Sequence, residues 1–147
     1  MRTAITVGQV LKEKGPGFWS IGPEATAYDA LELMAEKNVG ALLVTESNKL
    51  VGMFSERDYA RKVILKGKSS KSTSVGELMT GSPISIDPGK TIEECMMLMT
   101  DKHIRHVPVI DNGTLTGVVS IGDIVHAIIS LQESAIEDLE SYITTGY

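Results

Sequence analysis

Apolar and polar positions along the chain follow one order, and the order occurs twice. Apolar residues first recur at helical spacing, at Ala30, Leu33 and Met34 and again at Ile92, Met96 and Met99. Two β-rich runs follow each helical stretch, residues 41–45 and 50–55 in the first half and residues 106–110 and 115–120 in the second. Polar turn residues separate the runs of each pair, which predicts two β-hairpins.

The ends of these elements complete a β-α-β-β-α unit. A short extended piece at residues 85–88 stops at a proline, and Thr91 then precedes Glu94 in a capping-box pattern that starts the first helix. A second helix is expected after each hairpin, at residues 56–66 and from residue 122 onward, and a short helix ahead of each unit, at residues 7–12 and 75–79. The fold class predicted is therefore α/β (α+β).

The two halves align as an internal repeat. Residues 18–64 match residues 83–129 without a gap, with 13 of 47 positions identical. Upstream the offset changes from 65 to 68, so the first copy holds about three extra residues within residues 12–17. Two long copies indicate a pseudo-symmetric pair rather than a solenoid. We predict a first repeat with its N-terminal helix at 1–66, a linker at 67–74, a second repeat at 75–131 and a helical tail at 132–147.

The tail carries an apolar stripe at Leu131, Ala135, Leu139 and either Tyr142 or Ile143. The stripe packs on its own domain in one interpretation and forms a subunit interface in the other.

Composition narrows the class of protein. The chain has 147 residues, of which 42% are hydrophobic and 22% charged, as in ordinary globular proteins. The net charge of −5 argues against nucleic acid as a partner. The single cysteine excludes an intramolecular disulfide, and no apolar run reaches the length of a membrane span or a signal peptide. We expect a cytoplasmic protein with no membrane partner.

One motif occurs in both copies, Gly-x-x-Ser-x-x-Asp, with its last two positions at Ser55 and Asp58 and again at Ser120 and Asp123. The Ser ends a strand and the Asp lies in the first turn of a helix, where free N–H groups and the helix dipole favour an anion. The carboxylate can accept hydrogen bonds from a ribose diol and the Ser hydroxyl can donate to a phosphate. The alternative is purely structural, because Ser and Asp at these positions also cap a helix.

These motifs, together with residues 103–110 (HIRHVPVI), resemble those of tandem cystathionine-β-synthase-type (CBS) domains, known as a Bateman module, over residues 7–131. The resemblance implies two repeats packed sheet to sheet about a pseudo-twofold axis. It also implies an adenosine-containing ligand, such as AMP, ADP, ATP, NAD or S-adenosylmethionine, in the clefts between them. Asp58 and Asp123 would hold ribose hydroxyls, and Ser55 and Ser120 would lie by the ribose or the α-phosphate.

The resemblance also implies where the adenine lies. Its pocket would use the first extended segment of a repeat and the strand after its first helix, here Gly17, Phe18, Trp19, Val39 and Gly40, or Ser82, Pro83, Ile84, Ile104 and Arg105. Trp19 is either a base contact or an ordinary core or rim aromatic. Arg57, Arg105 and His106 are the candidate phosphate contacts. Arg57 aligns with Gly122 and Arg105 with Gly40, so the two clefts should differ.

Other chemistry finds little support in the sequence. His103 and His106 lack a third apparent metal ligand, so we expect no bound metal. Cys95 is interpreted as a small core residue. No nucleotide-hydrolase or nucleophile motif occurs, so we expect no catalytic residues and no enzyme.

The sequence thus predicts an adenine-nucleotide-binding sensor, most simply a homodimer, whose geometry a separate effector protein would read. The alternative is a structural dimerisation module with no physiological ligand.

Overall fold

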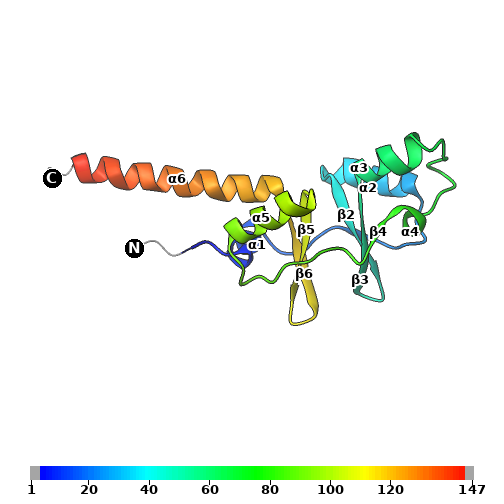
Figure 1. The fold of residues 1–147 in the computed structure, drawn as a ribbon, viewed down its shortest axis with the longest axis horizontal. Helices are drawn as coiled ribbons and strands as arrows, with labels where there is room; N and C mark the ends of the chain where they lie inside the picture. The colour runs from blue at the N-terminus through cyan, green and yellow to red at the C-terminus, as the bar shows by residue number, and fades with distance from the viewer. Residues whose placement is uncertain (1–3, 145–147) are drawn as a thin grey trace.

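The first repeat is a four-stranded sheet with helices against one face, seen on the right of Figure 1. The computed structural model describes residues 4–144. Strand order is β1-β2-β3-β4, with β1 (Ser20–Ile21) parallel to β2 (Ala41–Glu46) and the other neighbours antiparallel. The remaining elements are α2 (Ala27–Lys37), β3 (Lys49–Ser55), α3 (Glu56–Tyr59), a π-helical turn η1 (Ala60–Ile64), α4 (Val75–Leu78) and β4 (Thr80–Gly81).

The second repeat follows the same plan. It contains α5 (Ile92–Lys102), the hairpin of β5 (His106–Asp111) and β6 (Thr114–Ser120), and α6 (Ile121–Thr144). Its first extended segment is reduced to one parallel bridge, between Ile86 and Val109. Both hairpins have a register shift at matched positions, after Val44 and after Val109. The predicted α+β class and the predicted hairpins are confirmed.

Matched local interactions start and stop the main helix of each repeat. Thr26 with Asp29 begins α2, and Thr91 with Glu94 begins α5, each pair forming a reciprocal capping box. Both helices end at a left-handed residue, Asn38 in the first repeat and His103 in the second. The sequence predicted the second start but neither of these ends.

The short helices that precede the two repeats, α1 and α4, each pack on the opposite repeat. The amides of Val7 and Gly8 in α1 (Val7–Lys14) donate to Lys90 and Pro88 of the second repeat at 2.8 and 2.9 Å. Val75 and Gly76 in α4 donate in the matched way to Ala25 and Pro23 of the first repeat, at 2.7 and 2.8 Å. We call α1 and α4 the exchanged helices.

The cores confirm this exchange. Val7 and Val10 are buried with the second repeat, while Val75 and Leu78 are buried with the first. We predicted that the N-terminal helix belongs to the first repeat (residues 1–66), because it directly precedes the other elements of that repeat in the chain. In space α1 belongs to the core of the second repeat, so the order of elements along the chain misplaces it.

The two repeats also meet through the faces of their sheets. Ala41, Leu43 and Met53 point away from their own helices and are buried together, against partly buried residues that include Leu115 and Val118 of the second repeat. Along β2 the alternate residues Leu42 and Val44 face the helices of the first repeat. This strand is therefore apolar on both faces because it lies between a helix layer and a second sheet.

The glycine that opens each repeated motif makes room for an exchanged segment. A Cβ on Gly52 would lie 2.3 Å from the sulfur of Met79 and 2.9 Å from the carbonyl oxygen of Thr80. A Cβ on Gly117 would lie 3.1 Å from a methyl group of Leu11. Gly117 admits a side chain of α1 and Gly52 admits the residues that follow α4, so the small size of both glycines is explained without a ligand.

Helix α6 continues well past the second repeat and projects from the body of the molecule (Figure 1). Leu131 still packs against the second core, but Ile136 and Leu139 are 57% and 65% exposed. The predicted stripe therefore leaves its own domain after Leu131. No helix within residues 4–144 has the length and apolar character to cross a membrane.

Replacing Gly52 by Ala should lower the free energy of unfolding by about 1–3 kcal/mol, because Met79 and the backbone at Thr80 must move. Urea unfolding measures the change. Gly81→Ala is the matched control, because its Cβ meets nothing within 4 Å, and it should stay within about 0.5 kcal/mol of the parent. Equal effects of the two substitutions would contradict the role given to Gly52.

Candidate functional site

The two repeated Ser–Asp pairs lie at the starts of α3 and α6. Ser55 N–H donates to Asp58 Oδ2 at 3.0 Å, and the Asp58 amide donates back to Ser55 Oγ at 3.1 Å. The second pair repeats this arrangement, with 2.8 Å from Ser120 N to Asp123 Oδ2 and 3.1 Å from Asp123 N to Ser120 Oγ. Both pairs are capping boxes, so the structural role weighed from the sequence is real.

Each carboxylate also meets a lysine, but from a different direction. Lys62, one turn further along the same helical segment, lies 3.4 Å from Asp58 Oδ1. Lys14, at the end of the exchanged helix α1, lies 2.9 Å from Asp123 Oδ2 and donates to the carbonyl of Val118 at 3.0 Å. Lys14 and Asp123 are 109 residues apart in the sequence, and the exchange of α1 brings them together.

The surroundings of Asp123 keep its carboxyl ionised. Burial alone would raise the pKa of Asp123, but the hydrogen bonds from Lys14 and Ser120, together with the charge of Lys14, hold this pKa below its ordinary value. The side chain is only 22% exposed, so this acid lies in a partly enclosed position. An ionised, partly buried carboxylate is a strong acceptor for hydroxyl donors.

His106 stands beside this second pair. Burial lowers the pKa of His106, and the positive charge of Lys14 lowers it further, against an opposing effect of Asp123. The imidazole is therefore neutral at pH 7, and Lys14 rather than His106 carries positive charge next to Asp123. A Cβ on Gly40 would lie 3.7 Å from the His106 ring, which places this histidine at the seam between the repeats.

The predicted arginines differ in what they contact. The guanidinium of Arg57 donates to the carbonyl of His103 at 3.2 Å, so it spans from the first repeat to the end of α5 in the second. The carbonyl of Arg105 accepts the amide of Ile121 at 2.8 Å, and the carbonyl of Gly40 accepts the amide of Glu56 at 3.0 Å. Gly40 and Arg105 thus lie at matched positions beside the two helix starts.

The predicted adenine-contacting residues fall into two groups. Val39 and Ile104 are partly buried and pack against the core of their own repeat. The others lie on the connections that lead into and out of the sheets, namely Gly17, Trp19, Ser82, Pro83 and Ile84. Trp19 is 48% exposed, and the ammonium of Lys37 lies 4.4 Å from the centre of its ring. This exposed ring favours the rim position weighed from the sequence over a core position.

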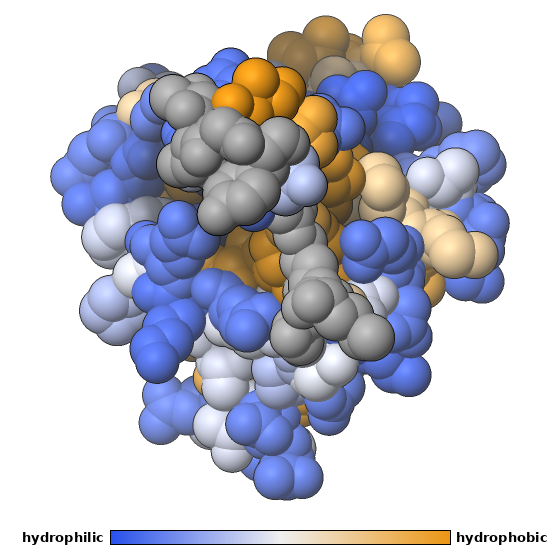
Figure 2. Space-filling view, turned by 90° about the vertical axis from the view of Figure 1, so that its left-hand side faces the viewer, coloured by the Kyte–Doolittle hydropathy of each residue, from blue (hydrophilic) through white to orange (hydrophobic). Residues whose placement is uncertain are grey.

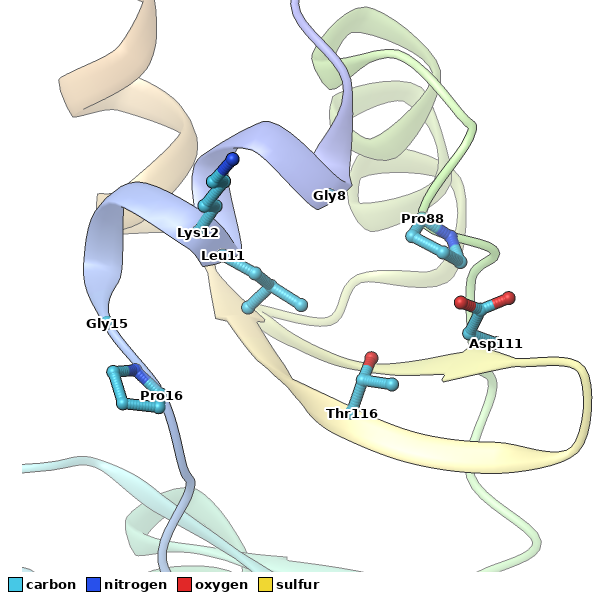
Figure 3. A pocket seen from close by; sticks show the side chains of 8 residues that line it. All are labelled: Gly8, Leu11, Lys12, Gly15, Pro16, Pro88, Asp111 and Thr116. Carbon is cyan, nitrogen blue, oxygen red and sulfur yellow. The ribbon is translucent and has the colours of Figure 1, made fainter.

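A surface hollow of about 400 Å³ lies elsewhere, between α1 and the β5–β6 hairpin (Figure 3). The residues that line it are Gly8, Leu11, Lys12, Gly15, Pro16, Pro88, Asp111 and Thr116, none of which the sequence predicted. Its two charged side chains, Lys12 and Asp111, are exposed and come from different elements. The repeated acid pairs therefore remain the better candidate site.

Cys95 is fully buried in the second core, and burial raises the pKa of its thiol to about 11. A thiol of this kind stays protonated and packs as a small apolar group. Within residues 4–144, no three His, Cys, Asp or Glu side chains are grouped as a metal ion would require.

Comparison with known proteins identifies the class. The family model of the CBS domain matches residues 15–65 and again residues 75–130. The chain therefore belongs to the CBS-domain family and contains two copies of that domain.

Relatives and solved structures agree with this assignment. The chain is 42% identical to "CBS domain-containing protein CBSX3, mitochondrial" of Arabidopsis thaliana, over 97% of this chain and 73% of the relative. Among solved structures, a putative signal-transduction protein with CBS domains from Burkholderia ambifaria is 45% identical, with a TM-score of 0.82 over 85% of this chain and 94% of that one. CBSX2, solved in complex with AMP, is 31% identical with a TM-score of 0.68 over 87% and 98% of the two chains.

No role was assigned to Lys14 or to Lys62 from the sequence. Lys14 lies in the stretch where the first copy holds its extra residues, and this departure from the repeat was the one available signal. Lys62 follows Asp58 at the i, i+4 spacing of helical ion pairs, which the sequence does display.

The stability of the protein should depend on pH through Asp123. Because its pKa is lower in the folded than in the unfolded chain, the carboxylate stabilises the fold above the ordinary pKa of an aspartate. This contribution is lost as the pH falls through the lowered pKa. Asp123→Asn should therefore cost up to about 1 kcal/mol at pH 7, and the difference from the parent should shrink towards zero at strongly acid pH. Urea unfolding at both pH values measures it, and a difference that persists in acid would contradict the assignment.

Proposed function

We propose that the chain is an adenine-nucleotide sensor, which holds ligands such as AMP, ADP, ATP or NAD at the repeated Ser–Asp pairs and acts by binding rather than by catalysis. One observation carries the proposal: a partly buried acid, Asp58 or Asp123, stands at a helix start in each copy of the motif. The family, and the AMP complex of CBSX2, support the adenine nucleotide as the ligand class.

Capping and ligand binding are compatible at Asp123. Within residues 4–144, the hydrogen bonds to Asp123 converge on Oδ2, which leaves Oδ1 to accept from a sugar hydroxyl. The cap holds the side chain in one rotamer, so the second oxygen has a fixed direction before a ligand arrives. This preorganisation lowers the entropy lost on binding.

Ligand at the seam would act on the angle between the repeats. The contact between Arg57 and the His103 carbonyl, and the approach of His106 to Gly40, both join residues of different repeats beside a Ser–Asp pair. A ligand that binds one geometry of this seam more tightly shifts the population towards it. A separate effector protein that contacts both repeats would sense that shift.

Asp58→Asn and Asp123→Asn should each weaken adenine-nucleotide binding at their own cleft. The amide keeps an oxygen for the cap but removes the charged acceptor, so about 1.5–3 kcal/mol, or a ten- to hundredfold loss in affinity, is expected. Titration calorimetry with AMP, ADP, ATP and NAD measures this.

Asp29→Asn is the matched control, because Asp29 holds the same capping position at α2 away from both motifs. It should leave affinity unchanged. If both test variants bind every nucleotide as the parent does, the acids are caps only and the alternative function, a structural dimerisation module, is favoured.

The proposed quaternary partner is a second copy of this chain. Exposed residues on α6 fall at alternating spacings of four and three: Val125, Ile129, Gln132, Ile136, Leu139 and Ile143. We call this set the α6 seam. Its spacing is that of the a and d positions of a coiled coil, with Gln132 as its one polar member.

The α6 seam faces away from the body of its own repeat. Ile124 and Ala127 occupy the opposite side of the helix and are buried in the second core. The end of the molecule from which α6 projects shows apolar side chains among a largely hydrophilic surface (Figure 2). Ile64, which matches Ile129 in the repeat, is also 60% exposed. The body and the partner helix can thus occupy different sides of α6.

Ile136→Lys should weaken self-association at least about tenfold, because it places a charge in the centre of a buried apolar seam. Sedimentation velocity over a range of concentrations measures the change. Ser134→Lys adds the same charge on another face of the exposed helix and should leave association unchanged. A parent protein that stays monomeric at high concentration would rule out the α6 seam as an interface.

A further inference from the structure

The two acid pairs differ in the origin of their cation. Asp58 meets a lysine of its own helical segment at 3.4 Å, whereas Asp123 meets Lys14 of the exchanged helix α1 at 2.9 Å. At the offset of 68 that aligns α1 with α4, the counterpart of Lys14 is Ser82. The first repeat therefore has no matching lysine at this position, and the two clefts are chemically unequal.

We infer that Lys14 is the residue that makes the Asp123 cleft select phosphorylated nucleosides over unphosphorylated ones. This inference rests on the proposed function and goes further by assigning a specificity to one cleft. Its basis is the position of the Lys14 ammonium 2.9 Å from Oδ2, one of the two Asp123 oxygens that a ribose diol would use.

The selectivity would arise because Lys14 can change its anionic partner from Asp123 to a phosphate. A neutral nucleoside whose two ribose hydroxyls donate hydrogen bonds to Asp123 competes with Lys14 for Oδ2 and offers the ammonium no other anion. A nucleotide carries a phosphate on the same sugar, which gives the displaced ammonium a new anionic partner. The long, flexible lysine stem allows such a change of partner without movement of the backbone.

The pair is suited to such a change. The Lys14 and Asp123 side chains are 42% and 22% exposed, so breaking the pair costs far less than breaking a buried one. His106 is a poor cation at this position, because burial, together with the charge of Lys14, lowers the pKa of its imidazole. Arg105 also lies near this cleft, but its side chain is exposed and its carbonyl accepts the amide of Ile121.

The test uses the full chain with Asp58→Asn, so that binding at the Asp123 cleft is measured alone. Calorimetry gives the affinities for AMP and for adenosine with Lys14 present and in Lys14→Met, which keeps the stem and removes the charge. We expect Lys14→Met to weaken AMP binding about tenfold and to leave adenosine binding unchanged or stronger. The ratio of the two affinities should therefore fall at least about tenfold.

Lys12→Met is the control, because it removes a neighbouring charge of α1 whose side chain lines the hollow in Figure 3. It should leave the ratio unchanged, and thermal melting confirms that each variant is folded. The inference is overturned if Lys14→Met preserves the ratio, shifts both affinities equally, or if the Asp58→Asn protein fails to bind AMP while the parent binds it. If the parent binds no nucleotide at all, the proposed function itself fails, which is a different outcome.

Discussion

The mutual exchange of the short helices α1 and α4 is the constraint on which the rest of this structure depends. Each helix is fixed by paired backbone hydrogen bonds to a Pro-containing loop of the opposite repeat and supplies two apolar side chains to that repeat's core. Each core is therefore built in part from the short helix that precedes the other repeat. The two repeats are thus one folding unit, and the seam between them is set by covalent connectivity as well as by contact between sheets.

The exchange also explains why the acid pairs of two nearly symmetric repeats have unequal surroundings. Helix α1 runs to Lys14, whereas α4 ends at Leu78 and passes directly into β4. The extra turns of α1 carry Lys14 to Asp123, while β4 instead adds a strand beside β3. A difference of a few residues in a connecting segment is therefore amplified into a difference in charge at the two helix starts.

Periodicity and cap chemistry predicted most of the fold, because both are local. The capping box of Thr91 with Glu94, the two hairpins and the α+β class are confirmed. The packing of α1 on the second repeat was not predicted, because both short helices begin with Val-Gly and this pattern does not distinguish them. Nothing in the sequence states which core each valine enters. The ion pair between Lys14 and Asp123 was not predicted for the same reason, because it depends on the packing of α1 against the second repeat.

The predicted site residues illustrate a further limit. Ser55, Asp58, Ser120 and Asp123 were found because the motif repeats, yet repetition does not separate a cap from a ligand clamp. The structure shows that Ser and Asp cap the helix at both sites. Capping is therefore established as one explanation for the repetition.

What distinguishes these caps from an ordinary one is their surroundings. Asp29 and Glu94 cap their helices at exposed positions, while Asp58 and Asp123 are only 18% and 22% exposed. A cap needs no such enclosure, because an exposed carboxylate satisfies the same amides. At Asp123, partial burial raises the cost of ionisation and is offset by Lys14, a cation from another part of the chain. That combination costs the fold more than a cap requires, and it fits a site at which a partly enclosed charge is held ready for a polar ligand.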